Sequence, residues 1–214
     1  GYIYLPSFYH DYKSKSGRSA AADVRKQLQI FKAEKVDGVI LDLRNNYGGI
    51  LEDAVSLAGL FIKSGPIVQV KNGTGYIEVL KDPDKEIVYE GPLVVLINSL
   101  SASASEIVAA ALQDYDRAII MGGPASYGKG TVQIITDLDR FLGDEFSILK
   151  PIGSLKLTIQ KYYRITGGSV QGKGVESDIS LPDIYEHLER EKDLDNALPW
   201  DTISPTLYRK WLTD

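Results

Sequence analysis

Three short apolar runs, rich in β-branched residues, recur along this chain, and each is followed by a loop or a turn. The runs lie at residues 39–41, 92–97 and 118–121, with helix-like segments between them. Runs of this length are typical of strands buried on both faces, as in parallel sheets that helices cover. The succession of strand, helix and strand repeats at least twice. It therefore predicts an α/β fold with a layered core of repeated βαβ units.

The remaining segments predict additional β-strands and a C-terminal appendage. Helices are expected at residues 20–35, with Ser19 as the N-cap, and at residues 51–62 and 105–115. The further strands are expected at residues 2–6, 66–70, 76–80, 87–89, 131–136 and 155–163. The charge-dense stretch 183–195 predicts a solvated helix. We expect a core over residues 1–182 and an appendage, packed on it or extending from it, over residues 183–214.

Composition excludes several classes of function. The 214 residues include no cysteine, so the chain has no disulfide, thiolate metal site or thiol nucleophile. His10 and His187 are the only histidines, and neither belongs to a pair with metal-ligand spacing. The net charge is −5 without a basic block, which argues against nucleic acid as a partner. The longest apolar run, residues 107–112, is far shorter than the roughly 20 residues of a membrane-spanning segment.

A cluster of small residues over 99–106 contains the first candidate catalytic group. It joins the apolar run 92–97 to the alanine-rich helix predicted at 105–115, and it includes Ser101, Ser103 and Ser105. A hydroxyl at such a junction is exposed at the end of the sheet, beside the free N–H groups of a helix N-terminus. The alternative is that one serine only caps the helix and the others allow close packing.

A glycine-rich turn over residues 122–131 contains the second candidate group, Lys129. Residues 123–129 match the spacing of a phosphate-binding loop. However, Gly130 stands where that loop needs Ser or Thr, and the β-branched residues 131–136 follow where it needs a helix. Nucleotide binding is therefore disfavoured. Lys129 is either a surface lysine or an amine held close to another loop.

Serine hydrolysis needs a base, and a chain with two scattered histidines offers lysine as the natural one. A lysine acts as a base near neutral pH only if burial lowers its pKa from about 10.4. A second glycine loop, residues 45–49, follows the strand at 39–41, and its N–H groups can point at a developing oxyanion. The alternative interpretation of this loop is that its glycines only form a tight turn between a strand and a helix.

These motifs, in this order, resemble those of the C-terminal processing (tail-specific) serine peptidases. The resemblance runs over nearly the whole chain and rests on six segments. They are DLRNNYGG at 42–49, GPLVVL at 91–96, SASASE at 101–106, YGKGTVQ at 127–133, TIQKYYR at 158–164 and DNALPWD at 195–201. The family core is of the ClpP/crotonase-like α/β type, which agrees with the repeated βαβ pattern.

Residue by residue, the resemblance implies that Ser103 is the nucleophile and that Lys129 is its general base. Gln133 would orient the lysine, and the backbone N–H groups of Gly49 and Ala104 would form the oxyanion hole. Asp114 matches a helix aspartate of some members, although we expect it to be a solvated carboxylate at the end of a helix.

This sequence departs from the family pattern in two places. The loop from Gly122 to Tyr127 is one residue longer than the common form, which bears on the placement of Lys129. No segment has the length and pattern of the PDZ domain that the family carries near the opening strand.

The resemblance implies a serine endopeptidase of the Ser-Lys dyad type that needs no cofactor. Its partners would be polypeptide substrates with apolar C-terminal tails, with an adaptor protein as a further candidate, and an extended substrate would add to a sheet edge. The implied location is the bacterial periplasm or cell envelope. Two alternatives remain open: a non-catalytic binding or scaffold domain that keeps the fold, and a crotonase-like acyl-CoA enzyme.

Overall fold

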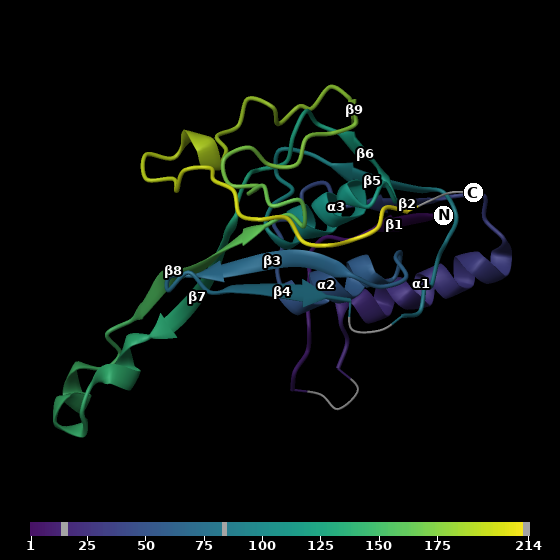
Figure 1. Ribbon diagram of the computed structural model, residues 1–214. Coiled ribbons are helices and arrows are strands. Elements are labelled where there is room, and N and C mark those ends of the chain that lie inside the picture. Colours follow the sequence, from purple (N-terminus) through teal and green to yellow (C-terminus); the bar gives the residue numbers. More distant parts are fainter. Residues whose placement is uncertain (14–16, 83–84, 212–214) are drawn as a thin grey trace.

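A computed structural model of the chain, which describes residues 1–13, 17–82 and 85–211, contains two sheets (Figure 1). The first is a parallel sheet with the strand order β1-β2-β5-β6-β9. Its strands are β1 (Tyr2–Tyr4), β2 (Val39–Asp42), β5 (Leu93–Ile97), β6 (Ile119–Gly122) and β9 (Ile179–Ser180). The apolar runs of the sequence form its central strands, which confirms the predicted α/β class.

Three helices connect and cover these strands. They are α1 (Ala20–Glu34), α2 (Leu51–Gly59) and α3 (Ala104–Asp114). Ser19 caps α1 as predicted, since its hydroxyl accepts a hydrogen bond from the Ala22 N–H at 3.2 Å. The helices α2 and α3 pack against each other, and both contact the second sheet (Figure 1). Helix α3 is almost entirely buried, which explains its alanine-rich, apolar sequence.

The second sheet is antiparallel, with the strand order β4-β3-β8-β7. Its strands are β3 (Pro66–Asn72), β4 (Ile77–Lys81), β7 (Thr131–Asp137) and β8 (Ser154–Tyr163). Figure 1 shows β7 and β8 leaving the body of the molecule together. The chain reverses at their far end through the 3₁₀ turns η1 (Leu138–Phe141) and η2 (Asp144–Leu149). We call the hairpin formed by residues 131–163 the arm.

Two predicted elements are wrong. Residues 87–89 do not form a strand, because their backbone docks on the end of α2 instead: the N–H groups of Val88 and Tyr89 both donate to the Leu60 carbonyl. Residues 183–195 do not form a helix, but turns and the short 3₁₀ helix η3 (Glu191–Asp193). This stretch lacks the apolar stripe that would hold a helix against the core.

The C-terminal segment runs back across the body in extended form (yellow in Figure 1). Backbone hydrogen bonds join Ile203 to Gly167, Thr206 to Ile165 and Trp211 to Tyr115. Among the described residues, no helix is both long and apolar enough to cross a membrane.

Candidate active site

The five residues proposed from the sequence lie around one cavity of about 190 Å³. Ser103 and Ala104 enter it from the start of α3, Gly49 from the loop after β2, and Lys129 and Gln133 from the turn and strand β7. The loop at Gly49 and the turn at Lys129, which lie about 50 residues before and 30 residues after Ser103 in the sequence, thus meet at the serine. The rest of the wall is mainly apolar and consists of Tyr47, Leu51, Ile107, Thr131, Val132 and Tyr162.

Ser103 differs from the serines on either side of it. The Ser101 and Ser105 side chains are fully buried, and their hydroxyls donate to the carbonyls of Leu43 and Asn46 at 2.8 and 2.9 Å. Ser103 is half-buried and faces the cavity. Its φ of 57° and ψ of −115° lie in a region that non-glycine residues seldom adopt, and such strain clusters at functional sites.

The glycine loop after β2 lies directly against Ser103. A Cβ atom on Gly48 would come within 2.8 Å of the Ser103 Cβ and 2.9 Å of the Ala104 nitrogen. A Cβ atom on Gly49 would meet the Phe8 carbonyl oxygen at 1.9 Å. Both glycines also have positive φ values, 98° and 142°. Only glycine therefore allows this loop to lie so close to the serine and to the chain after β1.

The N–H groups of Gly49 and Ala104 are free to bind a ligand. In the described part of the chain, neither donates a hydrogen bond to another residue, although neighbouring groups of the loop do: the Gly48 N–H donates to the Asn46 side chain at 2.9 Å. Both residues line the cavity. The Ala104 N–H also lies in the first turn of α3, where the helix dipole favours negative charge.

Burial lowers the pKa of the Lys129 amine from its ordinary value, and the positive charge of Lys156 on β8 lowers it further. The carboxylates of Glu191 and Glu106 act in the opposite direction. Within the described residues, Lys129 forms no ion pair. The surroundings of this lysine thus shift it toward the neutral form, which a general base requires.

Gln133 lies on the cavity wall, but its amide donates to the Thr158 hydroxyl at 3.3 Å. No hydrogen bond between Gln133 and Lys129 is found among the described residues. Its role in orienting the lysine therefore stays a prediction.

Glu106 is a residue of this site that the sequence analysis did not single out. Its side chain is fully buried and accepts four hydrogen bonds, from the N–H groups of Ser103, Gly128 and Lys129 and from the Ser126 hydroxyl, at 2.6 to 3.0 Å. One carboxylate therefore ties the serine turn to the lysine turn. The Ser-x-x-Glu spacing of a capping box is the signal that could have identified it.

Two further residues hold the same loops together. The Tyr162 hydroxyl lies against the carbonyls of both Ser103 and Lys129. The buried Asn46 side chain donates to the Leu5 carbonyl and accepts from Gly48, while its own carbonyl accepts from the Ala102 N–H. No local sequence pattern indicates either role.

We expected Asp114 to be solvated, but its side chain is buried. It is 8% exposed and pairs with Arg164 at 2.5 Å. Burial raises its pKa, and the hydrogen bonds and charge of Arg164 oppose that shift. The pair joins the end of α3 to the residue after β8, which gives Asp114 a structural contact outside the cavity.

Comparison with known proteins places this chain among serine peptidases. The profile of peptidase family S41 matches residues 1–181, and the chain belongs to that family. This confirms the resemblance inferred from the six motifs.

The relatives include the tail-specific protease of Haemophilus influenzae, which is 46% identical over 213 residues covering 96% of this chain and 28% of the relative. The carboxy-terminal-processing protease of Bartonella bacilliformis is 39% identical over 79% of this chain and 37% of its own length. This chain thus spans well under half of either protein.

Among solved structures, the photosystem II D1 C-terminal processing protease superposes with a TM-score of 0.68 at 28% identity, over 84% of this chain and 42% of that one. Mature CPAF gives a TM-score of 0.66 at 18% identity, over 85% of this chain and 46% of that one, and so shares the fold.

Proposed function

We propose that this chain carries the catalytic centre of a serine endopeptidase of the Ser-Lys type, which cleaves polypeptides near apolar C-terminal tails. The observation that supports it best is the shared cavity, in which Ser103, Lys129 and the free N–H groups of Gly49 and Ala104 meet. The side chains of Leu51, Ile107 and Val132 on its wall suit an apolar substrate segment. The name of the tail-specific protease of Haemophilus influenzae supports cleavage that depends on a tail of the substrate. We also propose a location in the bacterial periplasm or cell envelope, which is what the resemblance of the six sequence motifs implies.

The reaction would begin when the Ser103 hydroxyl attacks the scissile carbonyl carbon while the neutral Lys129 amine accepts its proton. The carbonyl oxygen becomes an oxyanion that the Gly49 and Ala104 N–H groups stabilise, each by about 3 kcal/mol. The ammonium of Lys129 then protonates the leaving amine as the C–N bond breaks. Water, deprotonated by the same lysine, releases the acyl group and restores the serine.

Three single substitutions test which hydroxyl acts. Ser103→Ala is expected to abolish hydrolysis of an unfolded reporter protein that ends in an apolar tail, because no other hydroxyl of the serine cluster faces the cavity. Ser101→Ala and Ser105→Ala remove buried hydrogen bonds, each worth about 1 kcal/mol, and should lower stability while activity per folded molecule persists. Hydrolysis is followed by mass spectrometry of the products. Full activity in Ser103→Ala would refute Ser103 as the nucleophile, whereas a parent chain that hydrolyses nothing would leave a binding or scaffold domain.

The pH dependence of hydrolysis should respond to Lys156. In the parent chain, kcat/KM is expected to rise with pH and level off above the pKa of Lys129, because only the neutral amine accepts the proton. Lys156→Gln removes a positive charge that lowers this pKa, so the rise should move to higher pH. Lys150→Gln is the control, since that charge in the arm is not one that shifts the pKa of Lys129. A profile that stays in place in Lys156→Gln contradicts the assignment of Lys129 as the titrating base.

A further inference from the structure

The arm carries an unusual amount of exposed apolar surface. Cross-strand pairing places Ile134 opposite Leu157, and Leu155 and Ile159 share that face of β8 because alternate residues of a strand point to the same side. All four are 40 to 45% exposed. We call these four residues the apolar face of the arm. A sheet face of this pattern ordinarily packs against another layer, yet this one is open.

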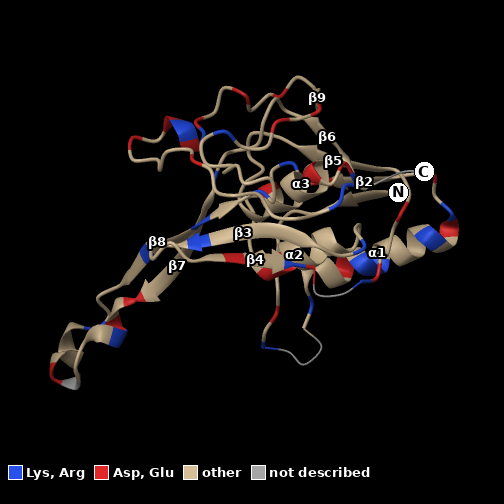
Figure 2. Ribbon diagram, viewed as in Figure 1, with Lys and Arg blue, Asp and Glu red and all other residues tan. Residues whose placement is uncertain are grey.

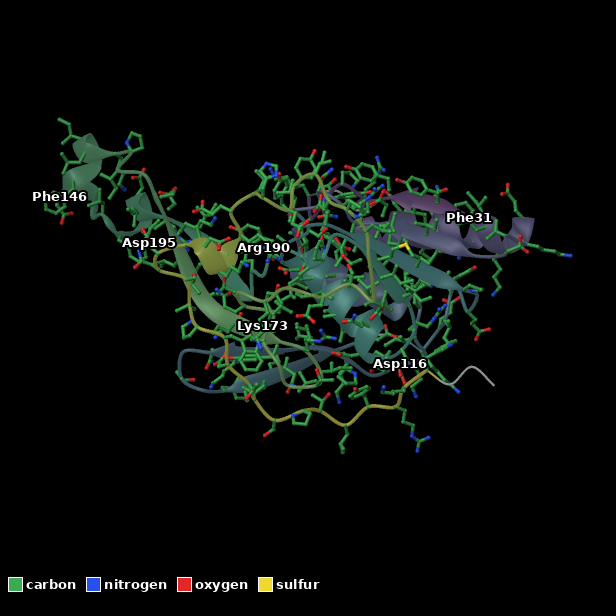
Figure 3. The ribbon with its side chains drawn as sticks, turned by 90° about the horizontal axis from the view of Figure 1, so that it is seen from above. Phe31, Asp116, Phe146, Lys173, Arg190 and Asp195 are labelled. Carbon is green, nitrogen blue, oxygen red and sulfur yellow. The ribbon has the colours of Figure 1, made fainter. Side chains whose placement is uncertain are left out.

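The tip of the arm is apolar as well. Phe141 is 74% exposed and Ile148 is 91% exposed, and Phe146, Leu149 and Ile152 lie beside them with large exposed fractions. Figure 3 shows Phe146 at the far end of the arm, away from the body. Exposed apolar residues that occur singly are normal, but a contiguous set of this kind marks an interaction surface.

The arm is continuous with the candidate active site. Strand β7 begins two residues after Lys129, and its first three residues, 131–133, form part of the cavity wall that Ser103 also lines. The same strand then runs outward to the tip. Any chain that leaves the cavity along β7 therefore meets the apolar face and the tip next.

Strand β7 also lies at the edge of its sheet. Its only partner among the described residues is β8, so the other side of its backbone has unpaired N–H and C=O groups. Such an edge binds an extended polypeptide through main-chain hydrogen bonds, whatever the sequence of that polypeptide. The seven residues of β7 correspond to about 23 Å, enough to hold about seven residues of extended chain.

The charges of the arm favour a variable partner. Figure 2 shows that acidic and basic residues alternate with uncharged stretches along the arm and that neither sign forms a continuous patch. They include Asp137, Asp139, Arg140, Glu145, Lys150 and Lys156. A folded partner matched by charge would favour a patch of one sign. Mixed charges around an apolar strip suit unfolded polypeptides, whose sequences differ from one substrate to the next.

We propose that the arm is a second binding surface for the polypeptide substrate, which holds an unfolded, apolar segment of it outside the catalytic cavity. This inference rests on the proposed function, since it takes the substrate to be a polypeptide. The apolar face and the tip would supply affinity that depends little on sequence, and the edge of β7 would guide the bound segment toward Ser103.

The test measures binding separately from hydrolysis. Ser103→Ala serves as the background, and the probe is fluorescein-labelled α-lactalbumin that is reduced and carboxymethylated, so that it stays unfolded. Fluorescence anisotropy gives the Kd. One variant changes Phe141, Phe146 and Ile148 to Ser at the tip. A second changes Leu155 and Leu157 to Thr, which suits a strand. Each is expected to raise the Kd at least about tenfold. Circular dichroism confirms that each variant is folded.

The matched control removes equally exposed apolar side chains elsewhere. Leu207 is 99% exposed and Ile184 is 76% exposed, and neither belongs to the arm. Their change to Ser should leave the Kd within about twofold. An unchanged Kd in both arm variants overturns the proposal. If the parent sediments as a dimer and the arm variants sediment as monomers with unchanged probe binding, the proposal is overturned as well, because the arm would then join two copies of the chain.

Failure of the proposed function would look different. In that case the parent chain with Ser103 would hydrolyse nothing, while binding of the unfolded probe would still depend on the arm.

Discussion

Lys129→Ala is expected to lower kcat/KM for an unfolded reporter by about 10²- to 10⁴-fold, the usual contribution of a general base. The effect is large because the described structure offers the Ser103 hydroxyl no other base in its cavity: the other side chains on the wall are Tyr47, Leu51, Ile107, Thr131, Val132, Gln133 and Tyr162. The measurement is steady-state hydrolysis at a pH on the plateau of the parent profile.

Lys129→Arg separates the role of a base from the role of a positive charge. The guanidinium keeps the charge but stays protonated in proteins, so it cannot accept the proton of Ser103. We therefore expect Lys129→Arg to lose as much activity as Lys129→Ala. An arginine variant that keeps most of its activity would show that the site needs only the charge.

The pH dependence of folding stability tests the lowered pKa of Lys129 independently of activity. Because burial lowers the pKa of Lys129, the unfolded chain binds more protons than the folded chain as the pH rises through the lowered pKa. The parent should therefore gain stability with rising pH in that window, up to the ordinary lysine pKa near 10.4. Lys129→Met lacks this gain. Direct titration that finds the amine fully charged on the plateau of activity would contradict its role as the base.

The sequence predicted the parallel sheet well because the local signals there agree with one another. The runs at 39–41, 92–97 and 118–121 are apolar without alternation, which is typical of parallel strands, and Ser19 gives a clear helix start. The expected burial on both faces is wrong, because one face of these strands is partly open: Ile40 is 38% exposed and Ile119 is 48% exposed. The wrong helix at 183–195 shows the limit of charge density as a signal. Solvated residues form a helix only if one side packs on the core, and these residues lack an apolar stripe.

The arm was predicted only as two strands. The alternation of Leu155, Leu157 and Ile159 correctly indicated a strand with one apolar face, and such a face normally implies burial. Its exposure depends on where the hairpin lies relative to the body, and periodicity carries no information on that placement. Tyr162 and Asn46 were missed for a related reason, since their contacts join segments that are far apart in the sequence.

Glu106→Ala is expected to destabilise the folded chain severely. It would leave four donors without this acceptor: the buried Gly128 N–H and Ser126 hydroxyl and the partly buried N–H groups of Ser103 and Lys129. Each unsatisfied buried group costs about 1–3 kcal/mol, so the sum approaches the roughly 5–15 kcal/mol that stabilise a whole domain. Urea denaturation measures the loss. Glu52→Ala is the matched control, because Glu52 lies in the first turn of α2 but is exposed, and its effect should stay below about 1 kcal/mol.

Glu106→Gln tests the charge of the same group. Burial raises the pKa of Glu106 to about 7, while its four hydrogen bonds act to lower it. The folded chain therefore binds more protons than the unfolded chain between the ordinary carboxyl pKa of about 4.3 and pH 7, so the parent loses stability as the pH rises through this window. Glutamine does not titrate, so the variant does not lose stability over this pH window. However, its amide nitrogen cannot accept a hydrogen bond and would face two of the four donors. The glutamine variant should thus be less stable than the parent at pH 5, by a margin that narrows by pH 8. If the difference in stability between the parent and the glutamine variant widens with pH, the four donors, and not burial, dominate the pKa of Glu106. Its carboxylate would then be fully charged while it holds the serine and lysine turns together.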